Sequence, residues 1–395
     1  MNPRKILHID LDAFFCAVEE QHNPTLRGKA FAVGGRPDER GVVAACSYAA
    51  RQFGLHSAMP MARAVRLCPR LIIVPSQHHR YRTVSREVMT HLHNLTPFVE
   101  QLSIDEAFLD VSDLAEPVAV IARQLQATIN QALDLPCSLG VATNKLVAKI
   151  ANNIGKASAK SDKPPNNIKI IPPGQEAAFL APLSVRELWG VGPKTAERLV
   201  RLGLHTIGDV ARYPENQLAQ QFGKVGQDLA WRAKGLDDRS VETDHEAKSI
   251  SQETTFTKDV TEVMVLHRTL RQQAEGVGRS LRQHDLSGIT VKIKIRWADF
   301  TTLTRQITLS RPTNLDKEIY QAALALFEKT WPPGKRVRLL GVGVSSFETD
   351  AYQLGLWDQA PVEEDQRLQS ALDELRHRFG DKAVRRGNQI QDEDE

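Results

Sequence analysis

Short apolar runs alternate with amphipathic segments along the first 173 residues. Five runs have the length of buried strands, and they lie at residues 5–9, 98–101, 107–111, 138–142 and 168–171. Three segments repeat apolar positions every three or four residues, which predicts helices at residues 81–95, 118–133 and 145–153. The order strand, helix, two strands, helix, strand predicts a βαββαβ ferredoxin-like sheet. We expect such a sheet to carry its helices on one face and to leave the other face open.

A compact insertion separates the first strand from the rest of this sheet. It contains predicted strands at residues 30–33 and 42–46 and a predicted helix at residues 48–53, and it ends at Pro75. The pattern therefore predicts a small subdomain inserted early in the chain.

The chain after Gly174 has a different texture. Short helices are predicted up to residue 236, and residues 237–247 are polar and charged, as expected of a linker. Residues 248–349 then mix helical segments with predicted strands at residues 291–297, 303–309 and 335–344. The predicted fold class is therefore a multidomain α+β protein.

Composition narrows the class of protein. At 395 residues the chain should form several domains, and 41% hydrophobic with 25% charged residues is ordinary for folded globular proteins. No apolar run approaches 18 residues, which predicts no membrane span. The four cysteines are far apart, which favours a reducing cytoplasm over a disulfide framework.

Charge is distributed unevenly, although the formal net charge is only +3. Residues 248–350 carry 16 Lys and Arg against 11 Asp and Glu, whereas residues 358–395 carry 6 against 11. A basic segment inside a nearly neutral chain is compatible with a nucleic-acid partner.

Three acidic residues lie at the ends of apolar runs. Asp10 closes the first predicted strand, and Asp105 and Glu106 lie between two later ones. Ionised groups inside apolar runs are costly unless they are paired or bind a metal. Strand ends that meet at one edge of a sheet would bring these acids together as ligands for two Mg²⁺ ions, which clamp the oxygens of a phosphoryl transfer. Asp12 either assists this site or caps the following helix, and the cap is favoured.

The segments Ile9-Asp10-Leu11-Asp12-Ala-Phe14-Phe15 and Ser103-Ile-Asp105-Glu106-Ala closely resemble motifs of the Y-family translesion DNA polymerases, in particular their bacterial members. The resemblance spans nearly the whole chain. It implies a palm (1–10 and 76–173), fingers (11–75), a helical thumb (174–236) and a little finger (248–349). It also implies that Asp10, Asp105 and Glu106 are catalytic and hold two Mg²⁺ ions together with the backbone carbonyl of Leu11.

The same resemblance implies a nucleotide pocket. Phe14 and Phe15 would contact the nucleotide, with Phe15 as the steric gate that excludes a ribose 2′-hydroxyl. Tyr48 and Arg51 share a helix face and would grip the triphosphate, for which a guanidinium is well suited. The usual triphosphate-binding Lys-Pro turn is altered here. Either Lys156 or Lys163 could replace its lysine, and Lys156 is preferred.

Two further segments favour binding of primer-template DNA. Gly190-Val-Gly192-Pro-Lys194-Thr195 resembles a helix-hairpin-helix turn, whose backbone N–H groups bind a phosphate. Basic residues alternate with apolar ones along the predicted strand 291–297, so one face carries Lys292, Lys294 and Arg296.

The C-terminal segment 350–395 contains a short motif and an acidic helical tail. Gln353-Leu354-Gly-Leu356-Trp357 resembles the pentapeptide with which bacterial replication proteins bind the sliding β clamp. Bacterial members of the family carry such a motif in this place.

The leading hypothesis is a monomeric, template-directed DNA polymerase for translesion synthesis, with low fidelity and no proofreading. A DNA-binding scaffold without catalysis is disfavoured because all three acids are present. A nucleotide cyclase on the same fold would leave the predicted DNA-binding segments without a purpose. A metal-dependent nuclease would not need Tyr48 and Arg51.

Overall fold

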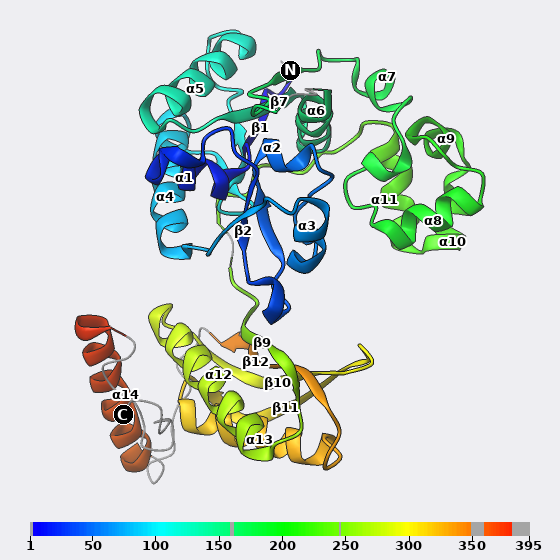
Figure 1. Cartoon of the computed structure of the whole chain (residues 1–395). Coiled ribbons are helices and arrows are strands. Elements are labelled where there is room, and N and C mark those ends of the chain that lie inside the picture. Colours follow the sequence, from blue (N-terminus) through cyan, green and yellow to red (C-terminus); the bar gives the residue numbers. More distant parts are fainter. Residues whose placement is uncertain (1–2, 159–161, 245, 349–358, 381–395) are drawn as a thin grey trace. The chain divides into compact units, whose positions relative to one another are not determined.

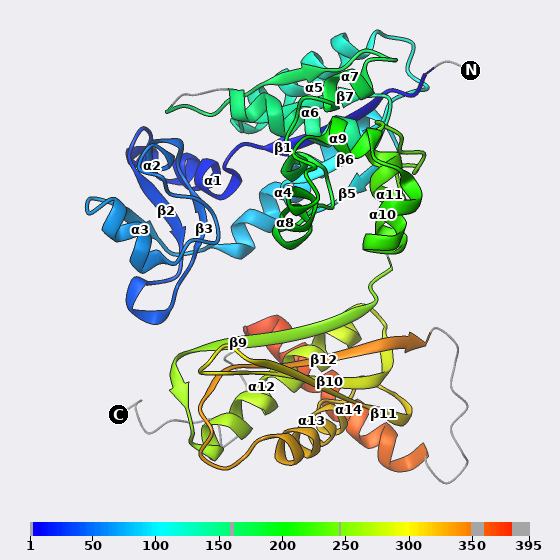
Figure 2. The ribbon, with the colours of Figure 1, turned by 90° about the vertical axis from the view of Figure 1, so that its right-hand side faces the viewer.

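The computed structural model describes residues 3–158, 162–244, 246–348 and 359–380 (Figures 1 and 2). It divides into two compact units, Met1–His245 and Glu246–Glu395. The division falls inside the segment 237–247 that the sequence indicates as a linker. Within the described ranges, no helix is long and apolar enough to cross a membrane.

A five-stranded sheet forms the centre of the first unit. Its strands are β1 (Ile6–Leu11), β5 (Val99–Gln101), β6 (Glu106–Asp110), β7 (Cys137–Ala142) and β8 (Ile168–Ile170). They are arranged in the order β5-β6-β1-β7-β8. β1 runs antiparallel to both β6 and β7, and β8 runs parallel to β7. The first four strands have the predicted ferredoxin-like order, and β8 extends the sheet at the edge next to β7.

Helices cover both faces of this sheet, which corrects the expectation of one open face. α4 (His78–Leu95) and α5 (Val118–Leu133) lie on one side of the strands and α6 (Lys145–Ser158) on the other (Figure 1). α6 packs closely on β7, since a Cβ on Gly140 would lie 1.9 Å from the carbonyl oxygen of Ala148. The carboxylate face of the sheet is therefore partly covered by α6.

The predicted insertion forms a small three-stranded sheet with its own core. The sheet order is β3-β2-β4, and the core includes Ala32, Val43 and Met61. The elements are α1 (Phe14–His22), η1 (Pro24–Leu26), β2 (Phe31–Gly34), η2 (Pro37–Glu39), β3 (Val43–Cys46), α2 (Tyr48–Arg51), α3 (Met61–Leu67) and β4 (Ile72–Val74).

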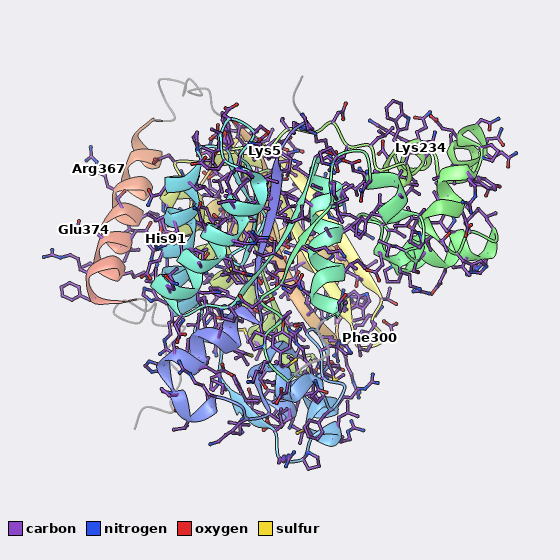
Figure 3. All side chains as sticks on the ribbon, turned by 90° about the horizontal axis from the view of Figure 1, so that it is seen from above. Lys5, His91, Lys234, Phe300, Arg367 and Glu374 are labelled. Atoms are coloured by element: carbon purple, nitrogen blue, oxygen red, sulfur yellow. The ribbon has the colours of Figure 1, made fainter. Side chains whose placement is uncertain are left out.

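Short helices follow the sheet, as predicted. They are α7 (Glu176–Leu180), η3 (Val185–Glu187), α8 (Pro193–Arg201), α9 (Ile207–Arg212), α10 (Glu215–Phe222) and α11 (Lys224–Ala233). Figure 3 marks Lys5, just before β1, and Lys234, at the end of α11. These helices share a hydrophobic core with α6. Asp237 strengthens the connection, because its carboxylate accepts the Leu146 backbone N–H at 3.0 Å, in the first turn of α6.

The second unit is an antiparallel sheet with two helices against one face (Figure 2). The strand order is β11-β10-β12-β9. The elements are β9 (Ser249–Val260), α12 (Val263–Gln283), β10 (Ser287–Trp297), β11 (Thr302–Thr313), α13 (Asp316–Thr330), β12 (Val337–Glu348) and α14 (Gln359–Phe379). The apolar pattern did not predict β9, because most of its residues are exposed and only Ile250, Phe256 and Val260 pack against the core. α14 contacts α12 through Arg282, whose Nε lies 2.7 Å from Asp373.

Candidate active site

The three predicted acids meet at the junction of β1 and β6. Asp10 is directly opposite Glu106 in the antiparallel register, so their side chains share the face that α6 partly covers. The carbonyl oxygen of Asp105 accepts the Leu11 backbone N–H at 2.9 Å. Strand pairing alone thus brings Asp10 close to Asp105 and Glu106, which lie at least 95 residues further along the chain.

Ser103 fixes the turn that carries Asp105. Its hydroxyl oxygen accepts the backbone N–H groups of Asp105 and Glu106, both at 3.2 Å, and its hydroxyl donates to the Asp105 carboxylate. The motif contained this serine, but the sequence did not indicate its role.

Two lysines of α6 contact three of the acids. The ammonium group of Lys156 lies 2.7 Å from Asp10 and 3.0 Å from Asp12, and that of Lys149 lies 2.6 Å from Glu106. The two lysines are seven residues apart, which places them on the same side of a helix. This spacing was the available signal for Lys149, but only the packing of α6 identifies its partner.

A buried histidine supports Glu106 from the neighbouring strand. His8 Nε2 lies 3.3 Å from the Glu106 carboxylate, and the Asn152 side-chain amide donates to His8 Nδ1 at 2.9 Å. Burial lowers the pKa of His8, which favours the neutral ring. Because Asn152 donates to Nδ1, the proton of the neutral ring lies on Nε2, which faces Glu106. The hydrogen bond from His8, together with Lys149, outweighs burial and lowers the pKa of Glu106 to about 2. Glu106 is therefore held ionised.

The chemistry of the site suits a hard divalent cation, although its side chains are not arranged around a single ion position. The carboxylates of Asp10, Asp12 and Glu106 contact the ammonium groups of Lys149 and Lys156, and burial, followed by the nearby charge of Asp105, raises the pKa of Asp10. This leaves an excess of negative oxygen ligands of the kind that Mg²⁺ binds. Among the described residues no group of three His, Cys, Asp or Glu side chains is arranged to hold a metal ion. We attribute this arrangement to Lys149 and Lys156, which form ion pairs with Glu106 and Asp10.

Asp12 does not cap α1, so the favoured interpretation from the sequence was wrong. The N-cap of α1 is Ala13, in a left-handed conformation with φ 48°, and the cap makes no side-chain hydrogen bond. The chain bends at Ala13, and the Asp12 carboxylate lies instead 2.9 Å from the Ser138 hydroxyl on β7. It also accepts the Asn166 backbone N–H at 2.9 Å. Asp12 is fully buried and belongs to the carboxylate cluster.

Phe15 is held by the aromatic ring behind it. The rings of Phe15 and Tyr81 stack with centroids 4.1 Å apart, and the Tyr81 hydroxyl donates to buried Glu19 at 2.7 Å. The neighbouring Phe14 side chain is only 2% exposed and lies in the core. The Phe14 ring therefore packs in the core beneath Phe15, and a contact between Phe14 and a nucleotide stays a prediction. The Leu11 side chain is buried too, which leaves its backbone as the group available to a ligand.

Tyr48 and Arg51 lie in α2, whose first turn is capped by Ser47. The Arg51 guanidinium lies 4.3 Å from the centre of the Tyr48 ring. The Tyr48 hydroxyl is buried without a hydrogen-bond partner in the described structure. Burial, and then the Asp12 charge, raise the pKa of Tyr48 to about 12, so the hydroxyl remains a donor. An unsatisfied buried donor beside basic side chains fits an anionic ligand.

A cleft of about 190 Å³ adjoins Tyr48. Its lining includes Asp12, Ser47, Tyr48 and Lys163. Lys156 and Lys163, the two candidates for the triphosphate-binding lysine, therefore both lie near Asp12. Lys156 contacts its carboxylate, and Lys163 lines the cleft.

The predicted hairpin turn precedes α8. Gly190 has φ +93°, and α8 has Gly192 as its N-cap, with no side-chain cap hydrogen bond. Its first backbone N–H groups are therefore available to a phosphate, with Lys194 exposed in the same turn and Thr195 half-buried.

The alternation along β10 is confirmed. Ile293, Ile295 and Trp297 are buried against the helices, while Lys292 is exposed and Lys294 and Arg296 are half-buried on the other face. Lys294 also contacts Glu253 of β9 at 2.7 Å. The predicted clamp motif at residues 353–357 lies outside the described residues.

Comparison with known families and proteins agrees with this geometry. The impB/mucB/samB family matches residues 9–153, its C-terminal domain matches residues 247–356, and the IMS family helix-hairpin-helix motif matches residues 173–204. The DNA polymerase IV of Desulfatibacillum aliphaticivorans is 41% identical over 97% of this chain and 96% of its own. That of Dehalococcoides mccartyi strain CBDB1 is 40% identical over 98% of both chains.

A solved structure supports the fold. A Y-family DNA polymerase chimera of Dbh and Dpo4 is 25% identical and superposes with a TM-score of 0.77, covering 88% of this chain and 100% of its own.

The chain therefore belongs to the impB/mucB/samB family and is a Y-family DNA polymerase. Within that family it groups with the bacterial enzymes named DNA polymerase IV, so it is a DNA-directed DNA polymerase of the translesion class. The predicted family, fold class and type of enzyme are confirmed, and binding to DNA and dependence on a metal follow from membership.

Proposed function

We propose that Asp10, Asp105 and Glu106 hold two Mg²⁺ ions for addition of deoxynucleotides to a primer 3′-OH, with the Leu11 carbonyl as a further ligand. The observation that carries this proposal is the register of β1 and β6, which sets Asp10 opposite Glu106, with Asp105 bonded to Leu11. Bound Mg²⁺ would stabilise the charge on the attacking and leaving oxygens. In this scheme the 3′-oxygen attacks the α-phosphate and pyrophosphate leaves.

The residues of the chain orient the reactants. Ser103 keeps the Asp105 carboxylate in place, and His8 and Lys149 keep Glu106 ionised. Tyr48 and Arg51 would bind the triphosphate, with Lys156 as the preferred lysine. Phe15, backed by Tyr81, would lie under the sugar and exclude the 2′-hydroxyl. We also propose that the enzyme copies DNA with low fidelity and without proofreading, because its small fingers insertion would leave the site open.

Primer extension on defined templates tests this function. The enzyme, Mg²⁺ and four deoxynucleotides should extend a primer on an intact template and on one carrying a minor-groove guanine adduct. Absence of extension on the intact template would sink the proposed chemistry.

We propose that primer-template DNA contacts Gly190, Gly192, Lys194 and Thr195 at the hairpin turn and the basic face of β10. The turn offers backbone N–H groups, and the strand offers Lys292, Lys294 and Arg296, so both would bind the phosphate backbone irrespective of sequence.

Lys292→Gln should weaken DNA binding, because it removes one exposed cation from the face of β10. The slope of log K against log salt should fall by about 1. Fluorescence anisotropy at several salt concentrations measures both. Lys329→Gln, on the exposed side of α13, is the matched control and should change neither. Equal effects of the two variants would argue against this face.

We further propose that Gln353, Leu354, Leu356 and Trp357 bind the sliding β clamp, and that the enzyme acts as a monomer in the cytoplasm. The support is the resemblance of the pentapeptide and its place after the last strand of the little finger. Leu356→Ala with Trp357→Ala should reduce capture by immobilised clamp by about tenfold or more, since central aromatic and aliphatic anchors dominate such contacts. Leu368→Ala, at an exposed leucine of α14, is the control. Undiminished capture of the double variant would exclude the motif.

A further inference from the structure

The lysines of α6 that face the sheet each contact one of its carboxylates. The pairs are Lys145 with Glu100 at 2.7 Å, Lys149 with Glu106 at 2.6 Å, and Lys156 with Asp10 at 2.7 Å. A helix that covers the catalytic face therefore brings its own cations to the acids.

Lys156 differs from the other two in its surroundings. Lys145 and Glu100 are both almost fully buried, so that pair is a fixed part of the core. The Lys156 ammonium instead lies between two carboxylates, 2.7 Å from Asp10 and 3.0 Å from Asp12. Its side chain remains 19% exposed, at the end of α6 nearest the Tyr48 hydroxyl. Burial alone would lower the pKa of Lys156, but Asp10 and Asp12 outweigh it and raise the pKa, so the group stays charged.

The Lys156 ammonium group contacts Oδ1 of Asp10, a carboxylate that the proposed metal site also uses. A metal ion and the Lys156 ammonium group cannot both contact the same oxygen of the Asp10 carboxylate, because the two positive charges repel each other at contact distance. The buried hydroxyl of Tyr48 and the guanidinium of Arg51 mark the neighbouring site for an anion, within reach of a long and flexible lysine side chain.

We propose that Lys156 is the resident counter-ion of Asp10 and Asp12 in the substrate-free enzyme, and that a divalent cation binds there only by displacing it onto the incoming triphosphate. This inference rests on the proposed two-metal function and deepens it. Lys156 would then be a positioning residue that couples two ligands. The cation frees Lys156 for the triphosphate, and the triphosphate holds Lys156 away from Asp10, so each should strengthen binding of the other.

The test is binding of Mn²⁺ to the full-length enzyme without nucleotide or DNA, followed by the EPR signal of free Mn²⁺. Lys156→Met keeps the length of the side chain but removes the charge, and it should tighten Mn²⁺ binding by about tenfold, within the usual range of coupling between sites. Lys169→Met is the matched control, since Lys169 is an exposed lysine on β8 that contacts none of these carboxylates in the described structure. It should leave Mn²⁺ binding unchanged. Asp10→Asn added to Lys156→Met should abolish the gain.

The outcomes separate this inference from the proposed function. If Asp10→Asn leaves Mn²⁺ binding intact in both backgrounds, the proposed metal site is wrong. If Asp10→Asn removes Mn²⁺ binding but Lys156→Met binds no tighter than the unmodified enzyme, only the counter-ion role is wrong.

A second measurement applies if Lys156→Met does not fold, as judged by circular dichroism. Lysines of the unmodified enzyme are methylated with ¹³C, and the Lys156 signal is assigned with Lys156→Arg. This signal should shift when saturating Mg²⁺ is added. An unchanged signal would overturn the proposal.

Discussion

Asp105→Asn is expected to reduce primer extension by about a thousandfold or more while leaving DNA binding nearly unchanged, because it removes a charged ligand from the reaction centre and no proposed contact to the duplex. The amide keeps the shape of the side chain and can still accept the Ser103 hydroxyl, so the turn should persist. Single-turnover extension with Mg²⁺ measures the chemical step, and anisotropy measures binding of the primer-template.

The control for this variant is another acid of the same strand region. Asp113→Asn changes an exposed residue just beyond β6 and should leave extension within about twofold, as surface substitutions usually do. Extension by Asp105→Asn that approaches the control would show that Asp105 is not a metal ligand.

Phe15→Ala should admit ribonucleotides. The ring stacks on Tyr81, which is itself fixed to Glu19, so it cannot easily move away from a 2′-hydroxyl. Forcing an extra atom into such a packed position costs about 1–3 kcal/mol, so removal of the ring should reduce sugar discrimination by about 5- to 150-fold. The measurement is the ratio of kcat/KM for a deoxynucleotide to that for the matching ribonucleotide.

Loss of the ring will also lower stability, because Phe15 is packed against the core. Thermal unfolding is therefore measured in parallel, and Phe53→Ala serves as a control at a partly exposed aromatic of the insertion. A structural defect alone would lower both kcat/KM values together and leave their ratio unchanged. An unchanged ratio for Phe15→Ala would remove Phe15 as the gate.

The sequence by itself located most of the elements and the acids. Strand and helix periods depend on neighbouring residues, so the apolar runs predicted β1, β6 and β7 to within a few residues. The placement of Asp10, Asp105 and Glu106 at strand ends was also local information. Alternation along β10 gave its basic and apolar faces directly, because side chains in a strand alternate between two sides.

Only the tertiary structure decided which groups the acids contact. Asp12 was expected to cap the next helix, but a left-handed residue at Ala13 turns it to Ser138, 126 residues away along the chain. Lys149 and Lys156 could be placed on one helix face from their spacing, whereas their partners depend on α6 packing across β1 and β7 at Gly140. Such contacts join elements far apart in sequence, and local patterns contain no information about them. The sequence therefore located the carboxylates, whereas the fold decided which lysines neutralise them.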